Sequence, residues 1–257
     1  CLKHIHAFDQ SLNVPVPVES IKGDIVNHVD GNIVRVQSFI KGIFIKDVEN
    51  PSPQLLNEFG KFLGKLDIAF KEFDYPELKR DWVWDVRNIG FLKTHLKYIE
   101  NQTDQDIISH FIANYESNIY PIEKYLRRQY IHNDGNDHNV LLNENGYISG
   151  IIDFGDMAYT FLASELAVAI TYLILEDEYP QEKIKVVVEG YQSVLPLRKE
   201  EINSLIHLIC IRACITVVTA NYRKKLFPDN EYITVTEPQA WKFLMNFVDK
   251  DLRTFKF

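Results

Sequence analysis

The sequence predicts an α+β fold, because a small β-containing piece at the start is followed by helices with one short hairpin among them. Two strands are expected at 18–21 and 33–39, on either side of the turn-forming Asp30-Gly31-Asn32. Apolar residues then recur mainly at helical spacing. Short apolar runs between 129 and 152 interrupt this spacing and predict the hairpin.

Helical patterns account for most of the chain. The clearest helix starts at Ser52-Pro53, where a capping hydroxyl precedes a residue whose φ angle already suits a helix. Gly60 and Gly64 lie one turn apart in it, which predicts that another backbone passes close by. Further helices are expected at 1–12, 104–115, 119–128, 161–175, 181–193, 199–222 and 237–252.

The expected hairpin region contains short strands at 129–131, 140–142 and 147–152. The sequence Asn143-Glu-Asn-Gly146 is typical of a turn between the last two. The final strand runs directly into Asp153-Phe154-Gly155. Polar side chains are therefore expected to meet at the open end of this hairpin.

Composition disfavours several classes of function. A net charge of −8 argues against nucleic-acid binding, which needs clustered Lys and Arg. Three cysteines do not form a disulfide framework. The longest apolar stretch, 161–175, is too short for a membrane span and contains Glu165, and no signal peptide opens the chain. We therefore expect a cytoplasmic protein without nucleic-acid or membrane partners.

Two short motifs predict metal-assisted phosphoryl transfer. The first is an H-x-D-x-x-x-x-N array formed by His132, Asp134 and Asn139, and Asp153 follows fourteen residues later. This chemistry needs a carboxylate near the attacking hydroxyl and oxygen ligands for Mg²⁺ beside the nucleotide phosphates. Asp134 is expected to orient or deprotonate the acceptor hydroxyl, and Asn139 and Asp153 are expected to hold the metal.

Together with Ser164-Glu-Leu-Ala-Val-Ala169, these motifs resemble the aminoglycoside phosphotransferase and choline kinase superfamily, which has a protein-kinase-like fold. The similarity is greatest to its hydroxylysine-kinase-like branch, whose domains also occur fused to class III aminotransferases. The resemblance implies that 1–40 is the remainder of a truncated β-containing N-terminal lobe with the interlobe hinge. It implies that 41–257 is the helical C-terminal lobe with the catalytic hairpin.

The same resemblance implies further site residues. Gln37, Ser38 and Phe39 occupy the place of the hinge, whose backbone would meet the adenine of ATP, or the guanine of GTP, with Ile152 near the ring. An edge strand without a ligand is the alternative. Glu165 would hydrogen-bond the catalytic-loop backbone. His132 is interpreted as a structural brace, because a kinase of this type needs no histidine base.

Four residues are candidates for the acceptor site. Asp137 either packs in the loop or contacts substrate, and Asp156 supports the site or binds a substrate amine. Trp84 and Asp85 lie in an aromatic and charged segment that could bind an amine or a carboxylate. The alternative for this segment is an aromatic lid on the core.

Two features of the superfamily are missing. The chain contains no Gly-rich phosphate loop and no strand with a phosphate-binding lysine, and neither Lys3 nor Lys22 is on a suitable strand. We expect these parts to lie upstream of Cys1, so this fragment alone would turn over ATP poorly. The leading prediction is a kinase for an amino alcohol such as hydroxylysine or homoserine. The alternatives are a non-catalytic module that regulates a fused or partner enzyme, and an aminoglycoside-modifying phosphotransferase.

Overall fold

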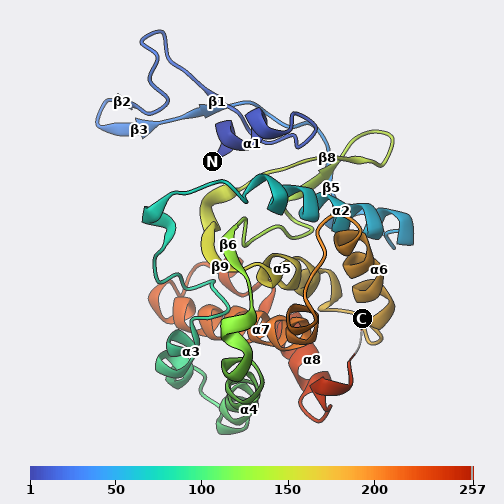
Figure 1. Ribbon diagram of the computed structural model, residues 1–257. Helices are drawn as coiled ribbons and strands as arrows, with labels where there is room; N and C mark the ends of the chain where they lie inside the picture. Colours follow the sequence, from blue (N-terminus) through green and yellow to red (C-terminus); the bar gives the residue numbers. More distant parts are fainter. Residues whose placement is uncertain (256) are drawn as a thin grey trace.

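The computed structural model describes residues 1–255 and 257, and it divides into a small β-containing part and a larger helical body (Figure 1). The small part contains helix α1 (Leu2–Phe8) and strands β1 (Pro17–Val18), β2 (Asn27–Val29), β3 (Asn32–Val34) and β4 (Val36–Gln37). Strand β1 pairs antiparallel with β4, and β2 with β3. The strand expected at 18–21 therefore appears as the short β1, whereas the strand expected at 33–39 is divided into β3, which pairs with β2, and β4.

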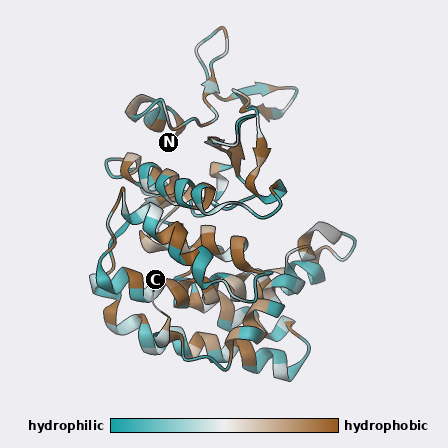
Figure 2. Ribbon diagram, turned by 90° about the vertical axis from the view of Figure 1, so that its right-hand side faces the viewer, coloured by the Kyte–Doolittle hydropathy of each residue, from teal (hydrophilic) through white to brown (hydrophobic). Residues whose placement is uncertain are grey.

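The strands of this small part have little core beneath them. Apolar side chains of β2–β4 remain exposed, including Val29, Ile33 and Val36, and Phe39 just beyond β4 is 90% exposed. The helical body differs, because its apolar residues face inward (Figure 2). The stable core of the described structure therefore lies in the body.

Helix α2 (Pro53–Ala69) begins as predicted, since the Ser52 hydroxyl accepts from the backbone N–H of Leu55. It packs against α6 (Gln181–Gln192) at close backbone distance. A Cβ atom on Gly60 would lie 2.0 Å from the carbonyl oxygen of Val187, and one on Gly190 would lie 2.1 Å from that of Asn57. The predicted close approach at Gly60 is thus confirmed, and glycine is required on both helices.

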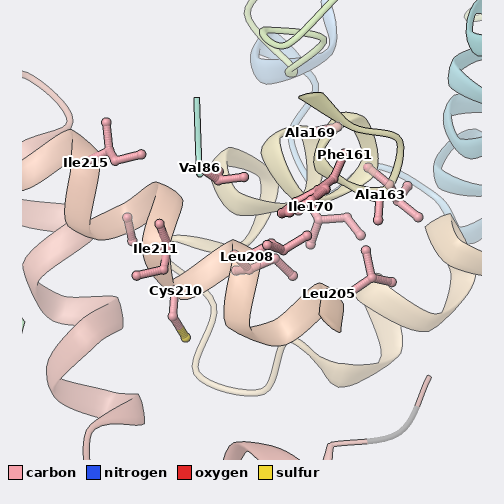
Figure 3. Close-up of a cluster of buried hydrophobic side chains, with 14 of the residues drawn as sticks. Val86, Phe161, Ala163, Ala169, Ile170, Leu205, Leu208, Cys210, Ile211 and Ile215 are labelled. Atoms are coloured by element: carbon pink, nitrogen blue, oxygen red, sulfur yellow. The ribbon is translucent and has the colours of Figure 1, made fainter. Parts of the chain in front are cut away.

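The other helices surround one long element, α7 (Lys199–Leu226), whose residues from Ser204 to Ala220 are buried. Around it lie α3 (Ile89–His95), α4 (Gln102–Asn118), α5 (Ala163–Ile174) and α8 (Glu237–Phe247). Figure 3 shows apolar side chains of α5 and α7 packed together, with Val86 and Phe161 beside them.

Helix α7 corrects one expectation. It, and not 161–175, is the longest apolar segment, and by length and composition it is the one helix of the described chain that would suffice to cross a membrane. Most of its apolar stretch is buried against the surrounding helices, as in the core helix of a folded domain. The packing therefore accounts for its apolar character.

Two small sheets position the two sequence motifs. Strands β5 (Ile43–Phe44), β7 (Val140–Leu142) and β8 (Ile148–Ile151) form one sheet in the order β5-β7-β8. Strands β6 (Arg128–Ile131) and β9 (Ala158–Phe161) form a separate antiparallel pair. The predicted β7–β8 hairpin is confirmed, and it pairs Val140 with Ile151, which brings the segments before and after it together.

The helix expected at 119–128 is wrong. A 3₁₀ helix at Tyr120–Tyr125 takes its place, and the chain then extends into β6. Pro121 has no backbone N–H to donate, and β6 gains its partner from β9, about thirty residues further on. Distant strand pairing therefore outweighs the local helical pattern.

Candidate active site

The loop 132–139 connects β6 to β7 and is hydrogen-bonded to Glu165 of α5. Asn133 adopts a left-handed conformation with φ of 63°, and its backbone N–H donates to Glu165 Oε2 at 3.1 Å. A Cβ atom on Gly135 would lie 2.4 Å from Glu165 Oε1, so only glycine fits over this carboxyl group. Glu165 therefore fixes the position of the loop backbone at Asn133 and Gly135.

His132 joins the loop to the end of β8. Its Nδ1 accepts from the backbone N–H of Asp134 at 3.2 Å, so Nε2 carries the proton and donates to the Ile152 carbonyl at 3.0 Å. Burial lowers the pKa of His132 to about 4. The ring packs edge-on against Phe154. A neutral imidazole that is hydrogen-bonded through both ring nitrogens therefore links the two motifs.

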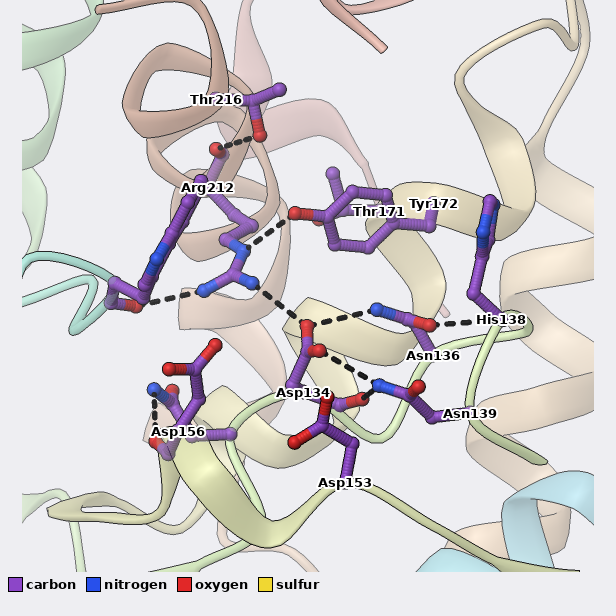
Figure 4. A network of polar contacts seen from close by, with 12 residues as sticks. Asp134, Asn136, His138, Asn139, Asp153, Asp156, Thr171, Tyr172, Arg212 and Thr216 are labelled. Atoms are coloured by element: carbon purple, nitrogen blue, oxygen red, sulfur yellow. Dashed lines mark hydrogen bonds and ion pairs between the residues drawn. The ribbon is translucent and has the colours of Figure 1, made fainter. Parts of the chain in front are cut away.

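The Asp134 carboxylate is held on both oxygens (Figure 4). Oδ1 accepts from Asn136 Nδ2 at 2.8 Å and from Arg212 Nη2 at 3.1 Å, whereas Oδ2 accepts only from Asn139 Nδ2 at 2.7 Å. Burial raises the pKa of Asp134 to about 6, and the charge of Arg212 opposes this rise. Oδ2 is thus the oxygen with room for a further hydrogen bond.

Arg212 is the residue that sequence reasoning missed. It lies in the middle of α7, its side chain is 1% exposed, and its guanidinium reaches three other segments of the chain. A signal was present, because one arginine within the apolar run 205–218 is too costly to bury without a partner. The sequence could not show that Asp134 is that partner.

Asn139 and Asp153 present hard oxygen atoms to the same region. The Asn139 amide nitrogen donates to Asp134 Oδ2 and to the Asp134 carbonyl at 2.8 Å, which leaves its oxygen for another ligand. Asp153 follows β8 with φ of 61°, and its exposed carboxylate accepts only from the Gly155 N–H, at 3.2 Å. Figure 4 shows the Asp153 carboxylate on the same side of the site as Asp134 and Asn139, and its negative charge contributes to raising the pKa of Asp134 and of Asp156.

This donor set fits magnesium better than a transition metal. Within residues 1–255 and 257, no group of three His, Cys, Asp or Glu side chains is placed to hold a metal ion. Mg²⁺ takes one or two side-chain oxygens and completes its shell with water and phosphate. One carboxylate and one amide oxygen at the mouth of the β7–β8 hairpin match that requirement.

Asp85 corrects another expectation. Its side chain is buried, Oδ1 accepts from the Thr160 hydroxyl at 2.7 Å, and Oδ2 accepts from Arg87 Nη2 at 2.7 Å. Arg87 Nη2 also donates to the Tyr159 carbonyl at 2.8 Å. Asp85 therefore joins its segment to β9, and both of its oxygens are already used, so substrate contact is not supported.

Asp156 lies on the Arg212 side of the site (Figure 4), and Trp84 contacts Arg212. The Trp84 ring lies 4.8 Å from the Arg212 guanidinium, and its backbone carbonyl accepts from Arg212 Nη1 at 2.8 Å. Asp156 is held by Trp82 Nε1 at 3.2 Å, and burial raises its pKa. Asp156 keeps one oxygen without such a contact in the described structure.

Comparison with known proteins identifies the family. The model of the Phosphotransferase enzyme family matches residues 1–198. This chain belongs to that family. Hydroxylysine kinase of Bos taurus is 30% identical over 236 residues, which are 87% of this chain and 62% of the kinase. Homoserine kinase of Gluconobacter oxydans is 26% identical over 237 residues, which are 90% of this chain and 72% of that kinase. This chain thus spans less than two thirds of the length of the hydroxylysine kinase.

Solved structures show the same fold. A microcompartment-associated aminopropanol kinase superposes with a TM-score of 0.73 at 17% identity, covering 93% of this chain and 76% of that one. An amicoumacin kinase superposes with a TM-score of 0.68 at 16% identity, covering 95% and 75%. The kinase-like α+β fold and the superfamily resemblance predicted from the motifs are therefore confirmed.

The residues predicted to contact the nucleotide base do not all lie at one cavity. Gln37 and Asp153 line one cavity of about 510 Å³ between β1, β4 and the end of β8. Ser38 does not line it, and its backbone N–H and hydroxyl are bonded to Val16 at 2.9 and 2.8 Å. Phe39 and Ile152 also lie outside the lining. The structure thus brings one of the four predicted nucleotide contacts to the same cavity as Asp153. Lys3 lines it too, on α1 and paired with Glu19 at 2.6 Å.

Burial of Glu165 predicts a pH-dependent stability. Burial raises the pKa of Glu165 from its ordinary 4.5 to about 7, so the folded state binds its proton more tightly than the unfolded state does. The stabilisation is therefore complete below about pH 4.5 and is lost as pH rises through 7. Relative to Glu165→Gln, the wild type should lose about 2–3 kcal/mol of unfolding free energy between pH 5 and 8.

Urea denaturation at the two pH values measures this difference. Glu189→Gln serves as the control, since that side chain is more than half exposed on α6 and should follow the wild type. A constant difference between wild type and Glu165→Gln would show that Glu165 is ionised throughout.

Proposed function

We propose that this phosphotransferase transfers the γ-phosphoryl group of ATP, or of GTP, to a hydroxyl of a small amino alcohol such as hydroxylysine or homoserine. The observation that carries the proposal is the placement of Asp134, Asn139 and Asp153 at the open end of the β7–β8 hairpin (Figure 4), where the backbone N–H of Ile152 donates to the Asn139 carbonyl. The names of its relatives support the acceptor class, and solved relatives are complexes with AMP-PNP and calcium or with GDP.

Asn139 and Asp153 are the residues that would hold Mg²⁺. The ion would supply positive charge that neutralises the negative charge developing on the phosphates. The protein's own part is to present two oxygens without competing donors. The Asn139 amide is turned so that its nitrogen faces Asp134, and the Asp153 carboxylate is exposed at the mouth of the hairpin.

Asp134 orients the acceptor. Its Oδ1 already takes two donors, so the hydroxyl hydrogen of the acceptor would bond to Oδ2. In that position Oδ2 would aim the hydroxyl oxygen at the γ-phosphorus atom and take its proton as the new P–O bond forms. The bond from that phosphorus to the β–γ bridging oxygen breaks at the same time, and the nucleoside diphosphate leaves. Phosphoryl transfer needs mainly this alignment, because little covalent chemistry is left to the protein.

A second cavity fits the amine of the acceptor. It has a volume of about 710 Å³ and lies beside Tyr172, whose hydroxyl is bonded to Arg212. Four acidic residues line it, against two lysines: Asp137, Glu176, Asp177 and Glu178. Within the described residues, Asp137 Oδ1 is buried without a hydrogen-bond donor. An ammonium group carries only donors, so an amine-bearing substrate complements this wall.

Replacing Asp137 by Asn tests that assignment. The variant should raise KM for hydroxylysine about tenfold or more, because a charge-assisted hydrogen bond to the substrate amine is lost, while kcat changes little. Steady-state kinetics with hydroxylysine and with its analogue lacking the side-chain amine measure the effect. Equal losses with both acceptors, or none with either, would show that Asp137 only supports the loop.

A screen of acceptors tests the function as a whole. Incubation of the full-length protein with Mg²⁺, ATP or GTP, and a panel of amino alcohols and aminoglycosides should give a phosphate ester with an amino alcohol. An ester formed only with aminoglycosides would favour a drug-modifying enzyme. Nucleotide binding without any ester would favour a non-catalytic module, whose proposed partner is a fused aminotransferase.

A further inference from the structure

We infer that Arg212 is a positioning residue for the phosphotransfer reaction, which acts by fixing the orientation of the Asp134 carboxylate. The inference rests on the proposed role of Asp134. Arg212 is far from both motifs in sequence, on a helix that otherwise forms the core. Its guanidinium nevertheless ends at the catalytic loop (Figure 4).

The guanidinium is held in one position by three hydrogen bonds. Nη1 donates to the Trp84 carbonyl at 2.8 Å, Nε donates to the Tyr172 hydroxyl at 3.2 Å, and Nη2 donates to Asp134 Oδ1 at 3.1 Å. The rings of Trp84 and Tyr172 lie 4.8 and 5.4 Å from the guanidinium carbon. A planar group with all these contacts has little freedom, so its bond to Asp134 has a defined direction.

That direction distinguishes the two oxygens of Asp134. Arg212 and Asn136 both occupy Oδ1, which leaves Oδ2 with Asn139 alone. The two asparagines belong to the same loop as Asp134 and move with it, whereas Arg212 belongs to α7. Arg212 is therefore the contact that fixes the carboxylate relative to the helical body, against which the acceptor binds.

The positive charge of Arg212 is also paired with Asp134. The Arg212 side chain is 1% exposed, and a buried guanidinium requires a carboxylate close by. Asp134 is the only carboxylate with which it forms an ion pair in the described structure. Removing either partner leaves the other charge buried and unpaired, whereas removing both does not. This reciprocity makes the pair suitable for a double-mutant cycle.

The test compares Arg212→Met and Arg212→Lys in the wild-type and Asp134→Asn backgrounds. Turnover is measured with Mg·ATP and hydroxylysine, and unfolding with urea. In the wild-type background, Arg212→Met should lower kcat about 100-fold, since a misplaced catalytic group costs this much, with nucleotide affinity changed less than about twofold. Arg212→Lys, which keeps the charge, should recover part of the loss. In the Asp134→Asn background the same substitutions should change kcat less than about twofold.

The unfolding cycle gives a readout that does not require activity. Arg212→Met should raise the unfolding equilibrium constant. Adding Asp134→Asn to that variant should lower the constant again by about tenfold. Arg127→Met is the control, because Arg127, which is 29% exposed, forms an ion pair with the buried Glu201 at 2.6 Å, and this pair does not include Asp134. It should destabilise the protein without coupling to Asp134→Asn and without changing kcat of the folded enzyme.

Equal losses of kcat from Arg212→Met in both backgrounds, or the absence of coupling in unfolding, would overturn the inference and leave Arg212 a packing residue. Unchanged turnover in Asp134→Asn alone would instead overturn the proposed function. The two failures are therefore distinguishable. If Arg212→Met does not fold, Arg212→Lys carries the same comparison, with a smaller expected loss.

Discussion

Replacing Asp134 by Asn is expected to lower kcat by about 10²- to 10⁴-fold, the contribution typical of a positioned acid or base. The loss follows from Oδ2, the oxygen of Asp134 that remains open to an acceptor hydroxyl. An amide has the same shape as the carboxylate but no charge with which to take the proton. Stopped assays with hydroxylysine and Mg·ATP measure the effect.

The remaining properties of Asp134→Asn separate chemistry from folding. Nucleotide affinity should stay within about twofold, because the proposed role of Asp134 is to contact the acceptor and not the phosphates. Asp249→Asn, an exposed aspartate beyond α8, is the control and should match the wild type. Near-normal turnover in Asp134→Asn would move the proton acceptor to another group.

Asp153→Ala is expected to weaken magnesium-dependent nucleotide binding by about 100-fold or more. The physical reason is the loss of the one exposed carboxylate at the mouth of the hairpin, where hard oxygens are needed for Mg²⁺. Calorimetric titration with ATP, in the presence and absence of Mg²⁺, gives both affinities. Binding without the metal should change little.

Asp153→Asn is the matched variant for this experiment. Asp153 has φ of 61°, a conformation that Asn tolerates and Ala does not, and its Oδ1 accepts from the Gly155 N–H. Asn keeps that turn and removes only the charge. If Ala weakens binding and Asn does not, the effect comes from the backbone turn, and the metal assignment to Asp153 is contradicted.

The parts of the site that could be predicted are local in sequence. Asp134, Asn139 and Asp153 flank one short hairpin, so the β7–β8 pairing alone brings them together. Hairpins form between neighbouring segments, and their turn residues are recognisable. The kinase-like fold could be predicted for the same reason, since each motif that identifies it is a short continuous stretch of sequence.

The parts that could not be predicted depend on distant contacts. Arg212 meets Asp134 across 78 residues, and Asp85 meets Thr160 across 75. Nothing local distinguishes Asp85, which is bonded on both oxygens, from Asp156, which is not. The false helix at 119–128 has the same origin, because β6 is stabilised by β9 rather than by its own sequence. Register and side-chain pairing over such separations are set by the whole fold.

A crystal structure with Mg²⁺ and a non-hydrolysable ATP analogue tests the central claim most directly. The account predicts one metal ion bound at about 2.0–2.1 Å to the side-chain oxygens of both Asn139 and Asp153. It also predicts the terminal phosphate facing Asp134 Oδ2 across the space for a hydroxyl group. A nucleotide bound with its metal away from Asn139 and Asp153, or with its terminal phosphate turned from Asp134, would contradict it.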